Sequence, residues 1–144
     1  MAKPDPALLD AARYPYRHTT TTRFADVDPN RHLNNVAIAA MFEDGRVRFN
    51  TAVRVLGALE GRRGMVASMA IEYLSEGYYP GDVSVHCAVE SVGRSSWTCL
   101  QLLVQNGRVI ALARSVLVSL VGDTPTALPD DLRATMIADW GLKG

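Results

Sequence analysis

Apolar and polar positions alternate with a helical period in the first half of the chain. After Asn34, apolar or small residues recur every three or four positions, which predicts one buried stripe on a long α-helix. Asn34 or Asn35 can cap its start, and Gly57 and Gly61 are expected to end it. Gly45 is a poor helix former, so we expect a neighbouring strand to approach the backbone there. The stripe consists of Ile38, Met41, Phe42, Gly45, Phe49, Ala52, Val53 and Leu56.

Extended segments flank this helix. Residues 16–24 are rich in β-branched side chains, which favours a strand before the helix. After the helix the period changes to two, which predicts half-buried strands. Asn106-Gly107 indicates a two-residue hairpin turn. The last strand is apolar on both faces and is expected to be central. The predicted strands cover about 65–75, 82–90, 95–104 and 108–121.

The order of these elements predicts an α+β domain in which one helix packs on an antiparallel sheet of about five strands. We expect a single domain over residues 1–144, with an N-terminal tail at 1–15 and a C-terminal extension at 122–144. A curved sheet that wraps the helix would cover its apolar stripe best. Unpaired sheet edges would then favour a homodimer or homotetramer.

Charge and cysteine content narrow the choice of partners. The chain has fifteen Lys and Arg and fifteen Asp and Glu, so no net charge draws it to nucleic acid or an anionic membrane. It shows no signal peptide and no long apolar run. Cys87 and Cys99 are its two cysteines, which fits a reduced cytoplasmic compartment. We therefore expect no nucleic-acid partner and no membrane partner.

The sequence gives little support for a metal site or for a serine hydrolase. His86 and Cys87 are adjacent on a predicted strand and point to opposite faces, and the histidines and cysteines have no zinc spacing. We therefore expect no metal, and no cofactor is indicated. Ser95 and Ser96 lack the Gly-x-Ser-x-Gly elbow of a serine hydrolase.

The stretch before the helix carries most of the candidate chemistry. It reads Arg23-Phe-Ala-Asp-Val-Asp-Pro-Asn-Arg-His-Leu-Asn-Asn35 and places Asp28, Asn30 and His32 at alternate positions. This clustering favours a functional role for Asp28 and His32. Asp26 and Asn35 are better explained as turn and cap residues.

That stretch resembles the loop of the hot-dog-fold thioesterases, which include hydroxybenzoyl-CoA thioesterase-like proteins and the plant acyl-carrier-protein thioesterases. Phe42-Glu43 with Arg46 resembles the family's following helix segment, and the likeness covers most of residues 16–121. It implies a hot-dog fold, in which a curved antiparallel sheet wraps one long central helix, and it implies thioester hydrolysis.

The resemblance also implies roles for single residues. Asp28 matches the acid that attacks the thioester or activates water in the hydroxybenzoyl-CoA branch, and Asp28, Asn30 and His32 match the Asp, Asn and His of the plant loop. Glu76 lies near the plant enzymes' second acid, although the following Gly77-Tyr-Tyr-Pro80 departs from their pattern. The hydroxybenzoyl-CoA branch lacks a residue like His32.

These residue types suit attack on a thioester carbonyl. Asp28 can attack it or activate water, and His32 can protonate the leaving thiolate or orient Asp28. The helix amide groups near Asn34, Asn35 and Val36 can hold the oxyanion. Glu76 and Glu43 are further substrate-binding candidates, although Glu43 is equally well explained as a solvated helix residue.

We therefore expect an acyl-CoA thioesterase without a cofactor. Arg62, Arg63 and Arg94 are candidates for the phosphates of coenzyme A, or ordinary exposed arginines. Three alternatives remain open on the same fold. They are a thioesterase for acyl carrier protein, a non-catalytic acyl-binding protein, and a hydratase that changes an enoyl substrate without freeing coenzyme A.

Overall fold

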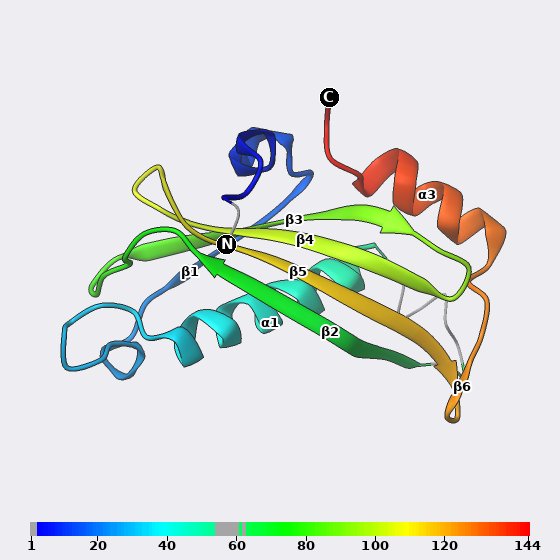
Figure 1. Cartoon of the computed structure of the whole chain (residues 1–144), viewed down its shortest axis with the longest axis horizontal. Helices are drawn as coiled ribbons and strands as arrows, with labels where there is room; N and C mark the ends of the chain where they lie inside the picture. The colour runs from blue at the N-terminus through cyan, green and yellow to red at the C-terminus, as the bar shows by residue number, and fades with distance from the viewer. Residues whose placement is uncertain (1–2, 54–60, 62) are drawn as a thin grey trace.

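A computed structural model describes residues 3–53, 61 and 63–144 as a curled antiparallel sheet with α1, Asn35–Ala52, packed on one face (Figure 1). The strand order is β1-β3-β4-β5-β2, and a short β6, Thr124–Pro125, pairs with the end of β5. This confirms the α+β and hot-dog predictions. The long strands are β1 Tyr16–Thr21, β2 Arg63–Tyr73, β3 Asp82–Val92, β4 Ser96–Gln105 and β5 Arg108–Val121.

Helix α1 begins where the sequence predicted. The Asn34 side chain accepts a hydrogen bond from the Ala37 amide at 2.8 Å, so Asn34 is the N-cap. The interpretation of Asn35 as the cap residue was therefore wrong, because Asn35 is the first residue of the helix. The described helix ends at Ala52, and the predicted continuation to Leu56 and Gly57 lies outside the described residues.

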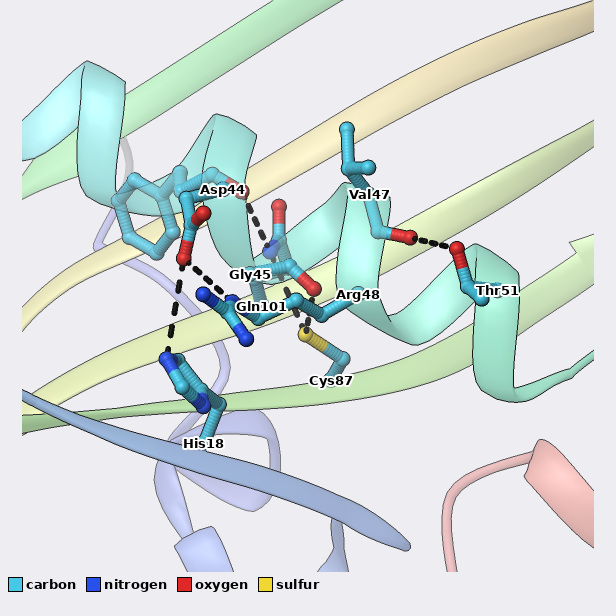
Figure 2. A network of polar contacts seen from close by, with 9 residues as sticks. His18, Asp44, Gly45, Val47, Arg48, Thr51, Cys87 and Gln101 are labelled. Atoms are coloured by element: carbon cyan, nitrogen blue, oxygen red, sulfur yellow. Dashed lines mark hydrogen bonds and ion pairs between the residues drawn. The ribbon is translucent and has the colours of Figure 1, made fainter.

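At Gly45, α1 comes close to the sheet. A methyl group added at Gly45 would lie 2.6 Å from Cγ1 of Val85 on β3, which confirms the predicted close approach. Next to this contact, the Gln101 amide donates to the Phe42 carbonyl at 2.9 Å, and Cys87 Sγ lies 3.8 Å from the Gly45 carbonyl (Figure 2). Small and polar groups, and not only apolar packing, therefore fix the helix on the sheet.

The side of α1 that faces β1 carries a charged network. Arg48 Nε donates to Asp44, four residues earlier on the helix, at 2.8 Å, and His18 Nε2 on β1 lies 3.7 Å from the same carboxylate (Figure 2). His18 is therefore a partly exposed strand residue that links β1 to the helix.

The two faces of β3 separate as expected. Val83, Val85, Cys87 and Val89 belong to the core under α1. His86 lies on the other face, yet it is only 8% exposed. Burial, reinforced by the charge of Arg17, lowers the pKa of His86 from its ordinary value.

The N-terminal segment covers a second apolar cluster. It forms two 3₁₀ turns, Pro6–Leu9 and Ala11–Arg13, and Tyr14 then packs with Ala88, Leu100, Leu102 and Leu112. Arg13 also donates to the Lys143 carbonyl at 2.7 Å. The segment is thus docked on the sheet face opposite α1.

Strands β5 and β2 differ in their surroundings. β5 is central as predicted, and the turn before it has positive φ at Asn106 and Gly107, as a two-residue hairpin requires. The prediction of a half-buried strand was wrong for β2, whose inward-facing Val66 and Met69 are 41% and 37% exposed. The reason is that β2 is an edge strand, whereas α1 packs against β3 and β4.

The C-terminal extension is part of the core. Helix α3, Asp130–Trp140, buries Leu132 and Met136 in the cluster beneath α1, and Trp140 stacks edge-on with Phe49 at 5.8 Å. Gly141 then forms a parallel bridge with Val89, beyond the part of β3 that pairs with β1. No helix in the described ranges is both long and apolar enough to cross a bilayer.

Candidate functional site

The loop between β1 and α1 is anchored by Asp26. This carboxylate is buried and accepts hydrogen bonds from the Arg23 guanidinium and the Arg23 amide, both at 2.8 Å. Desolvation by burial raises the pKa of Asp26, but the hydrogen bonds and charge of Arg23 outweigh it, so the pKa is lowered overall. The Asp26 carbonyl also accepts from the Asn34 amide at 2.8 Å. These contacts indicate that Asp26 is a structural residue.

Asp28 closes the turn that follows. One carboxylate oxygen accepts from the amides of Asn30 at 2.9 Å and His32 at 3.3 Å, and the Asp28 amide donates to the His32 carbonyl. Arg31 adopts a positive φ of 65° within this turn. Oδ2 has no hydrogen bond within the described ranges. Asp28 is therefore fixed through one oxygen and leaves the other for chemistry.

His32 and Glu76 form an ion pair across two loops. Nε2 of His32 lies 3.0 Å from Oε2 of Glu76. The Tyr78 ring packs edge-on against the imidazole at 5.4 Å, and its hydroxyl lies 3.4 Å from the same Glu76 oxygen. The Glu76 carboxylate thus contacts one ring nitrogen of His32, Nε2. The second ring nitrogen, Nδ1, takes no part in this ion pair.

Backbone contacts fix the segment that carries Glu76. The Leu33 amide donates to the Gly77 carbonyl at 2.8 Å, and His32 bridges to Tyr78 in antiparallel fashion. The Gln105 side chain accepts from the Tyr78 amide at 2.8 Å and donates to the Tyr78 carbonyl at 2.9 Å. Because Gln105 ends β4, this clamp joins the polar loop to the sheet.

The N-terminus of α1 opens onto a cavity of about 360 Å³. The side-chain oxygen of Asn34 caps the helix, whereas Asn35 and Val36 are exposed. The backbone amides of Asn35 and Val36 find no acceptor in the part of the chain that the structure describes. Unpaired amides at a helix start favour negative charge. The cavity is lined by Arg23, Ala25, Asp26, Asn34, Asn35, Val36, Ala37 and Ala40.

Glu43 does not join the loop residues. It lies about two helical turns after Asn35, where it lines a separate cavity of about 250 Å³ between α1 and the inner face of the sheet. Arg46 and Asn50 line the same cavity. Val36, Ala40, Glu43 and Val47 follow one another along the same face of the helix, at spacings of three or four residues.

The structure thus brings Asp28, Asn30, His32 and Glu76 together in two joined loops. Sequence reasoning missed Tyr78 and Gln105, which hold Glu76 and its segment. A polar residue at the end of an otherwise apolar strand, just before the Asn-Gly turn, was the one available signal for Gln105.

The remaining basic and metal-binding candidates can also be placed. Arg63 donates to Asp123 at 2.9 Å, and Arg62 lies outside the described residues. Among the described residues, no group of three or more His, Cys, Asp or Glu side chains is placed to hold a metal ion.

Comparison with known proteins identifies the family. Residues 22–136 match the family model described as the thioesterase-like superfamily. A thioesterase from Thermus thermophilus, solved in complex with coenzyme A and Zn, is 32% identical, and the match covers 88% of this chain and 94% of that one with a TM-score of 0.78. The chain therefore belongs to the thioesterase-like superfamily.

Two further solved structures extend the likeness. A predicted thioesterase from Bacillus stearothermophilus is 29% identical over 90% of this chain and 98% of its own, with a TM-score of 0.78. A 1,4-dihydroxy-2-naphthoyl-CoA thioesterase from Synechocystis is 10% identical over 85% and 96%, with a TM-score of 0.73, and shares the fold. A search of curated proteins gives no match.

Proposed function

We propose that this member of the thioesterase-like superfamily hydrolyses acyl-CoA to a free acid and coenzyme A. The observation that carries the proposal is the joined pair of loops beside a helix start, which offers a carboxylate, a histidine with an acidic partner and unpaired amides. The complex of the Thermus thermophilus relative with coenzyme A supports the choice of thiol.

Asp28 acts first in this mechanism. As a general base, its carboxylate takes a proton from water while the water oxygen bonds to the thioester carbon. As a nucleophile, the carboxylate itself bonds to that carbon and forms an anhydride, which water then opens. The turn supports either role because it fixes one oxygen of Asp28 and leaves Oδ2 unpaired within the described chain.

The start of α1 stabilises the charge that develops. When the carbonyl carbon becomes tetrahedral, its oxygen gains a negative charge that the amides of Asn35 and Val36 can hold. The helix dipole adds to this stabilisation. Asn30, whose side chain is exposed beside the turn, is suited to hold the water or the carbonyl.

His32 assists the leaving group. The tetrahedral intermediate collapses, the carbon–sulfur bond breaks, and the thiolate takes a proton. A protonated imidazole can supply it, and the carboxylate of Glu76 at 3.0 Å from Nε2 fixes the orientation of the ring.

Release of free thiol from acyl-CoA tests the reaction. A panel of short, long and aromatic acyl-CoA substrates should yield thiol with at least one member, together with the free acid. Binding without thiol release would instead indicate an acyl-binding protein. With an enoyl-CoA included in the panel, hydration of its double bond without thiol release would indicate a hydratase. Either result would refute the proposal.

Asp28→Asn tests the leading residue. We expect kcat to fall by about 10²–10⁴, the usual contribution of a general base, with little change in KM. Asp130→Asn, which removes an exposed carboxylate on α3, is the matched control and should retain wild-type kcat. Full activity in Asp28→Asn would exclude Asp28 from both roles.

Single-turnover hydrolysis in ¹⁸O-labelled water separates the two roles of Asp28. Attack by the carboxylate places the label in Asp28 when water opens the anhydride at the aspartyl carbon, whereas activation of water places it in the acid product. Mass spectrometry of the peptide that contains Asp28 reads the difference directly.

We further propose that two copies associate through β2. Among the described residues no strand pairs with the outer edge of β2, and Met65, Val66 and Met69 are exposed apolar residues of this strand. Such an edge is suited to antiparallel pairing with a second copy, which would extend the sheet.

A further inference from the structure

Arg46 on α1 is a buried cation that has no carboxylate partner among the described residues. Its side chain is 5% exposed, and within those residues its hydrogen bonds go to Ser115 Oγ at 3.5 Å and Met69 Sδ at 3.9 Å, both near the limit for such contacts. No acidic group in the described ranges lies within 4.0 Å of the guanidinium. A buried charge with so little compensation is costly, so the site favours an anion.

The guanidinium lines the 250 Å³ cavity between α1 and the sheet, together with a second buried polar group. Asn50, one turn further along α1, is 6% exposed, and its amide makes no hydrogen bond to the residues described. Glu43 lines the same cavity but is exposed, so it lies on the solvent side of Arg46 and Asn50. The deeper part of the cavity therefore presents donors.

The remaining walls are apolar. Val47, Val66, Trp97 and Leu117 line the space, with Gly64 against the Trp97 ring; Trp97 and Leu117 are buried, whereas Val47 and Val66 are exposed. Apolar walls around a buried guanidinium suit a carbon chain that ends in a carboxylate. The phosphates of coenzyme A are strongly hydrated and are a poor match for such walls.

The cavity lies in line with the proposed site of hydrolysis. Arg46 follows Asn35 by eleven residues, so the two positions lie roughly 16 Å apart along the helix axis. The small side chain of Ala40 lies between them on the same face as Val36 and Val47. An acyl chain that lies over Ala40 would connect the oxyanion amides with the cavity.

We propose that the cavity at Arg46 binds the distal carboxylate of an ω-carboxyacyl group, which makes dicarboxylic acyl-CoA thioesters the preferred substrate class. Arg46 and Asn50 bind the carboxylate, and the apolar walls hold the carbon stem. This inference rests on the proposed thioesterase function and deepens it, because Arg46 becomes a specificity-determining residue of that reaction.

Substrates matched in length test the preference. Adipoyl-, suberoyl- and sebacoyl-CoA should be compared with hexanoyl-, octanoyl- and decanoyl-CoA, so that each pair differs only in the distal carboxylate. We expect higher kcat/KM for the carboxylated member of at least one pair. Equal or lower values in all three pairs would overturn the inference while leaving thioester hydrolysis established.

Arg46→Met removes the charge and keeps an unbranched side chain. We expect kcat/KM to fall at least about tenfold for the preferred carboxylated substrate, as for loss of one hydrogen bond to a charged group, and to change little for its neutral partner. Arg46→Lys should restore part of the preference, because it keeps the charge without the planar fork. Arg48→Met, on the side of α1 that faces β1, is the matched control and should keep the wild-type preference.

Binding of the free diacid separates this inference from the proposed reaction. In Trp140→Phe, Trp97 is the one remaining tryptophan, so its fluorescence reports on the cavity wall. Suberate should change this fluorescence, and octanoate should do so more weakly. The suberate response should be lost in the Arg46→Met background.

These results distinguish the two proposals. Arg46-dependent binding of suberate without thiol release from any substrate would contradict the thioesterase proposal and support the carboxylate site. Arg46 can instead be compensated by an acidic residue of a second copy. Arg46→Met would then lower the oligomeric mass in light scattering without changing the substrate preference, and that result would overturn the inference.

Discussion

At the scale of single residues, the contact between His32 and Glu76 distinguishes the two acidic residues of the site, Asp28 and Glu76. Asp28 has an oxygen without a partner in the described structure, whereas Glu76 contacts His32 and Tyr78. Asp28 is therefore the candidate for contact with substrate. Glu76 is better described as a positioning residue that acts through the imidazole.

Glu76→Gln should lower kcat about tenfold with little effect on KM, because it replaces a hydrogen bond to a charged carboxylate with one to a neutral amide. Steady-state kinetics on the best substrate measure kcat and KM separately. Glu90→Gln, which alters a carboxylate paired with Arg114, is the control and should leave kcat unchanged.

The double variant His32→Gln with Glu76→Gln shows whether the two residues act as a unit. If Glu76 acts through His32, the double variant should be no slower than His32→Gln alone. Losses that multiply would show that Glu76 contributes independently, and the positioning role would then be wrong.

At the scale of secondary-structure elements, the contact between α1 and β3 depends on a missing side chain. Gly45→Ala should lower the free energy of unfolding by about 1–3 kcal/mol, because the new methyl group would lie 2.6 Å from Val85 Cγ1. This result opposes intrinsic helix propensity, which favours Ala over Gly by about 1 kcal/mol. Urea denaturation measures the change.

Val85→Ala provides the matched background, since it removes Cγ1, the Val85 atom nearest to the methyl group that Gly45→Ala adds. In that background the cost of Gly45→Ala should shrink or reverse, and a double-mutant cycle isolates the coupling. An undiminished cost would mean that the close approach to Val85 is not the reason for glycine.

The same elements show what sequence patterns can predict. The helix cap at Asn34, the close contact at Gly45 and the Asn106-Gly107 turn were predictable because each depends on local backbone geometry. The exposure of β2 was not, because alternation shows which residues share a face but not whether another element covers it.

The candidate site likewise contains one part that the sequence predicted and one part that it did not. Asp28, Asn30 and His32 are clustered in the sequence, so their proximity was foreseeable. The contact of His32 with Glu76 was not, because it depends on Leu33 and Tyr78 joining two loops and on Gln105 at the end of a distant strand. No local signal encodes such a contact.

At the scale of the whole molecule, the open edge of β2 predicts the behaviour of the protein in solution. Met65→Lys together with Val66→Lys should lower the mass measured by light scattering from that of an oligomer towards that of one chain. In a symmetric dimer both subunits carry the new lysines at the interface, so like charges repel each other across it.

The control for this double variant carries the same added charge elsewhere. Val121→Lys with Ile137→Lys also replaces two exposed apolar residues, but neither lies on β2, so the mass should stay that of the wild type. An oligomer that survives Met65→Lys with Val66→Lys would place the interface on another surface.

The bridge between Gly141 and Val89 has a consequence for aggregation. β1 pairs with β3 only from Asp82 to Cys87, and the chain after α3 covers the next part of that edge. Uncovered strand edges recruit other strands, and this stretch of β3 includes the apolar Val89 and Val92. The residues that follow α3 therefore shield the sheet against fibril-like strand addition at one edge, while no described strand covers the other edge at β2.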